Sequence, residues 1–161
     1  MMALLDPDFW ELTSFIVTTL GLPLALYSFI YQQRKERDNE EAAEYQMLSD
    51  GYVDFLKLVI RNPDLKLRSH SSTPDLTEEQ RERMLLIFDI LISLFERAYL
   101  LVYEENMAAR AQRRWNSWED YMREWCRRDD FYDHLDDLLQ GEDPEFAAHI
   151  KKVAAEVRTV R

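Results

Sequence analysis

Apolar side chains recur at intervals of three or four residues through most of the chain, a spacing that places them on one face of an α-helix. The first such run ends at Asn62-Pro63, and its apolar residues are Tyr45, Leu48, Tyr52, Phe55 and Val59. Similar runs predict helices over residues 108–125, 131–139 and 146–157. The pattern therefore favours an all-α fold.

One stretch, residues 84–103, is apolar nearly all round. Thr77 and Gln80 before it form a capping box, which predicts a helix from there to about residue 106. A membrane span is the competing interpretation, but three charged residues would be costly at depth: Asp89, Glu96 and Arg97. We therefore predict the central helix of a small bundle.

Residues 12–31 carry no charge, and as a helix they would extend about 30 Å, the thickness of the hydrocarbon part of a bilayer. Acidic residues precede the segment where a signal peptide would have basic ones, which favours a retained anchor over a cleaved signal. Arg34, Lys35 and Arg37 follow it, so the positive-inside rule places the C-terminal side in the cytoplasm.

These observations predict a single-pass protein of a bacterial inner membrane with its N-terminus outside. Its N-terminal transmembrane segment is residues 1–33, and the helix continues into a cytosolic helical bundle over residues 34–161. The lipid bilayer is thus its first expected partner.

Small or polar residues form a narrow stripe along the predicted span: Ser14, Thr18, Gly21, Ala25 and Ser28. Small residues let helices approach closely in lipid, so the stripe is a candidate seam of a homo-oligomer. Two alternatives stay open, an anchor whose small residues are incidental and a pore lining. Pro23 predicts a kink, with Thr18 and Thr19 able to satisfy the freed backbone groups.

Composition and charge limit the classes of partner that the chain is expected to bind. The formal net charge is −11, from 31 acidic and 20 basic residues, which opposes bulk binding of nucleic acid. With three glycines, the chain has little material for glycine-rich phosphate loops. The single cysteine, Cys126, excludes an internal disulfide and is expected to pack in the core.

Arginines gather around a tryptophan-rich helix, where guanidinium groups beside aromatic rings suit a nucleotide or another small anionic ligand. The arginines are Arg110, Arg113, Arg114, Arg123, Arg127 and Arg128, and the tryptophans expected to pack inward are Trp115, Trp118 and Trp125. Five aspartates follow within residues 129–137, so charge balance inside the protein is the favoured alternative.

Candidate chemistry is sparse. His134 follows Asp130 by four residues and His149 follows Glu145 by four, which would suit a metal or acid-base role. The chain has no Glu-x-x-His pair, nucleophile elbow or phosphate-binding glycine loop. We expect no catalytic residue, metal or cofactor, and a helical-bundle metal protein or enzyme is the least favoured alternative.

The C-terminal pattern of Trp115, Trp118, Tyr121 and Trp125, with the sequence Asp-Pro-Glu-Phe at 143–146, resembles small bacterial single-span membrane proteins of unknown function. In layout the chain is also similar to membrane-anchored effectors of bacterial defence. We predict a non-enzymatic protein that self-associates through its transmembrane helix and carries a helical sensing or interaction domain. The alternative is an oligomeric channel or membrane-perturbing effector gated by a cytosolic ligand such as a nucleotide.

Overall fold

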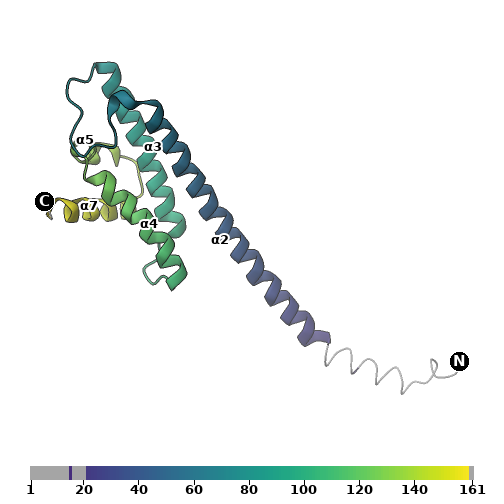
Figure 1. Ribbon diagram of the computed structural model, residues 1–161. Helices are drawn as coiled ribbons and strands as arrows, with labels where there is room; N and C mark the ends of the chain where they lie inside the picture. Colours follow the sequence, from purple (N-terminus) through teal and green to yellow (C-terminus); the bar gives the residue numbers. More distant parts are fainter. Residues whose placement is uncertain (1–14, 16–20, 160–161) are drawn as a thin grey trace, which may run out of the picture. The chain divides into compact units, whose positions relative to one another are not determined.

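The computed structural model describes residue 15 and residues 21–159, which contain helices and no strand (Figure 1). The elements are α2 (Leu22–Arg61), η3 (Pro63–Leu65), α3 (Glu78–Val102), α4 (Ala109–Cys126), α5 (Asp129–Asp133), α6 (Leu135–Leu138) and α7 (Pro144–Thr159). The all-α prediction is confirmed. The chain divides into two units, Met1–Glu44 and Tyr45–Arg161, and the second contains the core.

The predicted transmembrane helix at residues 12–31 is wrong for the described part of the chain. Across residue 15 and residues 21–159, no helix combines the length and the apolar character that crossing a bilayer requires. In α2 the polar run that follows Tyr31 begins at Gln32, so the described apolar part is far shorter than the roughly 20 residues of a span. Residues 12–14 and 16–20 of the predicted span lie outside the described residues.

The small-residue stripe is described only in part. Ser14 and Thr18 lie outside the described residues, whereas Gly21 directly precedes α2 and both Ala25 and Ser28 are exposed on it. The kink expected at Pro23 depends on residues 18 and 19, which also lie outside the described part. Because the seam was inferred for a helix in lipid, the correction of the span removes its basis.

Local sequence signals determine where the helices of the second unit begin. The Thr77 side chain accepts from the Gln80 amide, and the Gln80 side chain accepts from the Thr77 amide, so the predicted capping box opens α3. Asp143 Oδ1 accepts from the amides of Glu145 and Phe146 and opens α7. The helix start at Thr77 was predicted correctly.

An aromatic cluster joins α2, α3 and α4 within the second unit. The Tyr52 ring meets Trp118 edge-on at 5.9 Å between centroids, and Phe55 meets Trp125 at 5.3 Å. Trp115, Trp118 and Trp125 are each at most 2% exposed, so the predicted tryptophan face of α4 lies inside. Gly51 of α2 lies against α3, where an added Cβ would come 3.2 Å from Leu94 Cδ1.

Candidate functional site

Among the described residues, the most completely buried ionic contact lies at the start of α5, between Arg128 and Asp130. Arg128, which directly precedes α5, is 1% exposed, and its Nη2 donates to Asp130 Oδ2 over 2.7 Å. Its Nε lies 2.5 Å from Asp130 Oδ1 as an ion-pair contact and not as an aligned hydrogen bond. The pair neutralises both charges where water does not reach them.

The same guanidinium group holds the segment between η3 and α3. Nη1 donates to the backbone oxygens of Lys66 and Ser69 over 2.8 and 3.0 Å, and Nη2 donates to Thr73 Oγ1 over 3.0 Å. Lys66 has a φ of 45°, a backbone conformation that residues other than glycine rarely adopt. These bonds therefore stabilise an otherwise unfavourable turn. Figure 1 shows this segment passing close to α5.

The structure disperses the other arginines of the predicted anion site. Arg123 binds Glu119 and Glu156 over 2.7 and 2.8 Å, and Arg127 binds Glu124 over 2.7 Å. The two carboxylates beside Arg123 raise its pKa further above its usual value. Hence these two arginines act in charge balance within the chain.

The remaining arginines of that group also do not point toward a common site. Arg114 lies over the Tyr45 ring at 5.1 Å, which is a cation–π contact between α4 and α2. Arg110 and Arg113 are exposed near the start of α4. The structure therefore does not gather these side chains around one ligand-sized space.

The two histidine-carboxylate pairs proposed from spacing have different surroundings. His134 Nδ1 lies 2.8 Å from the backbone oxygen of Asp130, whose carboxylate is occupied by Arg128. The His149 ring lies among the rings of Tyr99, Tyr103 and Trp115, and burial lowers its pKa. Across the described residues, no group of three or more potential ligand side chains could hold a metal ion.

The proton affinities of Cys126 and Glu142 differ from those of exposed groups of the same type. Burial raises the pKa of the Cys126 thiol to about 12, which keeps it protonated and unreactive. Glu142 has its pKa raised to about 7, first by burial and then by a hydrogen bond to Glu96 and by the charges of Glu96 and Asp89. These carboxyls form an acidic cluster beside α3.

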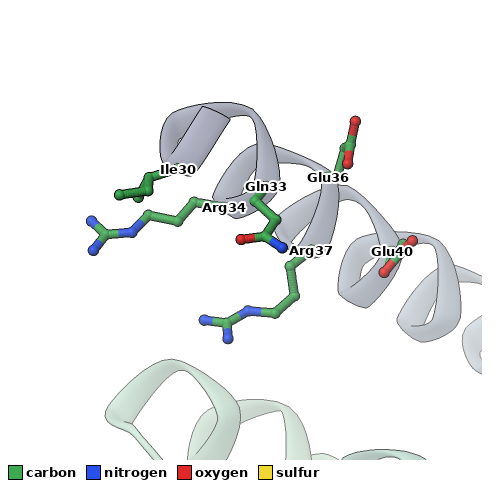
Figure 2. A pocket seen from close by; sticks show the side chains of 6 residues that line it. All are labelled: Ile30, Gln33, Arg34, Glu36, Arg37 and Glu40. Carbon is green, nitrogen blue, oxygen red and sulfur yellow. The ribbon is translucent and has the colours of Figure 1, made fainter. Parts of the chain in front are cut away.

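A shallow hollow on α2 has all its walls on one helix, as Figure 2 shows. Its lining residues are Ile30, Gln33, Arg34, Glu36, Arg37 and Glu40. In this view Glu36 extends to one side of α2 and Arg37 to another, so the charged groups do not converge. A surface with a single wall does not enclose a small molecule, and we assign no ligand to it.

The outer face of α3 is an exposed apolar surface in the second unit, and the start of α2, from Leu22 to Tyr31, is another in the described residues. We use the name outer face of α3 for Leu86, Asp89, Ile90, Ser93, Arg97, Leu100 and Leu101, all of which are exposed. Leu86 and Leu100 are 57% and 58% exposed, Ile90 48% and Leu101 42%. An apolar surface along most of a helix is typical of a contact with another protein.

Sequence reasoning missed both Arg128 as a buried anchor and the outer face of α3. The sequence places Arg128 in a run of charged residues, where nothing distinguishes it from Arg127. The apolar residues at 84–103 predict the central helix of a bundle, but they do not indicate which side of that helix stays exposed. Exposure on one side is a property of the packing, which the sequence alone does not specify.

Comparison of the chain with protein-family models, with curated protein sequences and with solved structures gave no match. The resemblance to small single-span bacterial proteins therefore stays a prediction.

Proposed function

We propose that this chain is a non-enzymatic helical interaction module that works as a homo-oligomer. The observation that carries the proposal is the outer face of α3, whose large apolar side chains point to solvent from the middle of a well-packed unit. In water, the free energy of the protein falls when such a face is covered by another apolar surface.

The polar groups support a structural role over a chemical one. Arg128 and Asp130 neutralise each other, Cys126 is protonated, and the His149 ring packs among aromatic side chains. Each of these groups contributes to the packing or charge balance of the second unit. An interaction module needs such a rigid unit, because it must present its binding face in one conformation.

The test is the molar mass of the purified chain in solution, measured by light scattering across a wide range of concentrations. One chain has a mass of 19.3 kDa. We expect the mean mass to rise with concentration toward that of two or more chains. A mass of one chain at every concentration would overturn the proposal.

A further inference from the structure

The outer face of α3 has the spacing of a helix-helix seam. Leu86, Ile90, Ser93, Arg97 and Leu100 are separated by four, three, four and three residues. This alternation keeps side chains in line along one side of a helix, as in the seam between two coiled helices. The buried residues of α3, such as Phe88 and Phe95, lie on a different side, so the helix carries two apolar faces.

The charges on this face are arranged symmetrically about Ser93. Asp89 lies four residues before Ser93 and Arg97 lies four residues after it, while Leu86 and Leu100 lie seven residues away on either side. Neither Asp89 nor Arg97 has an ion-pair partner within the described residues. Two such helices in antiparallel orientation would bring unlike charges to the same height.

We infer that the outer face of α3 binds the same face of a second copy of this chain, antiparallel, about a two-fold axis beside Ser93. Asp89 of each copy then lies opposite Arg97 of the other, and Leu86 lies opposite Leu100. The inference rests on the proposed function and adds to it the surface, the orientation and the register of the contact.

Shape and charge around Asp89 agree with this arrangement. A shallow hollow of about 450 Å³ lies on the N-terminal half of α3, and its lining includes Leu85, Leu86 and Asp89. The two-fold axis would bring Leu100 and Leu101 of the second copy to this hollow. Glu142 lies near enough to Asp89 for their charges to interact, so a guanidinium group from outside meets an acidic surface.

Ser93 suits the position at the axis because it is small. Helices that pack side by side have axes about 8–10 Å apart, so the facing Cα atoms at a point of contact come close enough for a disulfide. Glu82 is exposed on the same helix, eleven residues before Ser93. In an antiparallel pair the two copies of residue 82 are therefore about 33 Å apart.

The first experiment is disulfide formation in two single-cysteine additions, Ser93→Cys and Glu82→Cys, in the whole chain. The native thiol of Cys126 is fully buried and does not compete. Under mild oxidation we expect Ser93→Cys to form a covalent dimer and Glu82→Cys to remain a single chain. Efficient cross-linking of Glu82→Cys would overturn the antiparallel register, because only a parallel or unspecific contact brings those residues together.

The second experiment exchanges the charges and measures the association constant. Asp89→Arg and Arg97→Asp should each weaken association by about tenfold or more, because each places like charges together at both symmetric contacts. The double variant restores unlike pairs and should recover the association of the wild type. Asp120→Arg and Arg113→Asp make the same charge changes at exposed positions of α4 and should have little effect.

Misfolding does not account for the expected pattern. Asp89→Arg introduces a positive charge near Glu142, so the unit should keep or gain thermal stability while losing association. If the wild type associates but the charge variants do not alter it, the α3 contact is refuted and the proposed function stands. If the wild type is a single chain at every concentration, both are refuted.

Discussion

Replacing Arg128 with Met leaves a buried carboxylate without its partner. Asp130 is 7% exposed, and the backbone oxygens of Lys66 and Ser69 would also lose a charged donor. Removing one member of a buried ion pair costs about 3–5 kcal/mol. For a unit of this size, a loss of about 4 kcal/mol lowers Tm by about 15 °C.

The size of this loss can be assigned to the unpaired charge with a double variant. Arg128→Met combined with Asp130→Leu leaves no buried charge, so its cost should fall to about 1–2 kcal/mol, from the hydrogen bonds lost to the loop. Arg127→Met is the matched control. The guanidinium group of Arg127 is half exposed, and its ion pair with Glu124 contributes less than about 1 kcal/mol.

Urea unfolding followed by tryptophan fluorescence measures these differences, since Trp115, Trp118 and Trp125 are buried in the same unit. Trypsin provides a local readout, because release of the loop in Arg128→Met should expose the bonds after Lys66 and Arg68 to cleavage. The reasoning fails if Arg128→Met costs less than about 1 kcal/mol, or if the double variant is less stable than Arg128→Met.

Two further measurements follow from the altered pKa values. Because the folded pKa of Glu142, about 7, lies above its ordinary value of 4.5, its contribution to stability is complete below that ordinary value and is lost as the pH rises through about 7. Glu142→Gln should therefore gain in Tm over the wild type as the pH rises, whereas Glu105→Gln should not, and parallel Tm curves would contradict this. Cys126, with a pKa of about 12, should react with a thiol reagent only at the rate of unfolding, and fast labelling of the folded chain would contradict its burial.

Local signals made the helices of the second unit predictable from the sequence. A capping box such as Thr77 with Gln80, or the sequence Asp143-Pro144 at a helix start, acts over three or four residues and needs no distant partner. The inward face of α4 was predictable for the same reason, since three tryptophans at helical spacing favour burial of that face.

Features that depend on distant contacts were not predictable in this way. The loop residues that bind Arg128 lie 55 to 62 residues before it in the chain, so its burial is decided by how the loop after η3 packs against α5. The separation of the other arginines in space has a related cause. Clustering of arginines along the sequence does not cluster them in space when carboxylates from α4 and α7 lie within reach, as Glu119 and Glu156 do for Arg123.

The energetics of the outer face of α3 indicate what kind of dimer to expect. Covering Leu86, Ile90, Leu100 and Leu101, each about half exposed, would stabilise the pair by about 4 kcal/mol per chain, or about 8 kcal/mol for two chains. Association itself costs about 4–15 kcal/mol in lost freedom of motion, so the apolar contribution alone is close to balanced. The two contacts between Asp89 and Arg97 then determine whether the dimer forms and in which register. We therefore expect a dimer that dissociates on dilution, and one that high salt weakens because its deciding contacts are ionic and lie at the surface.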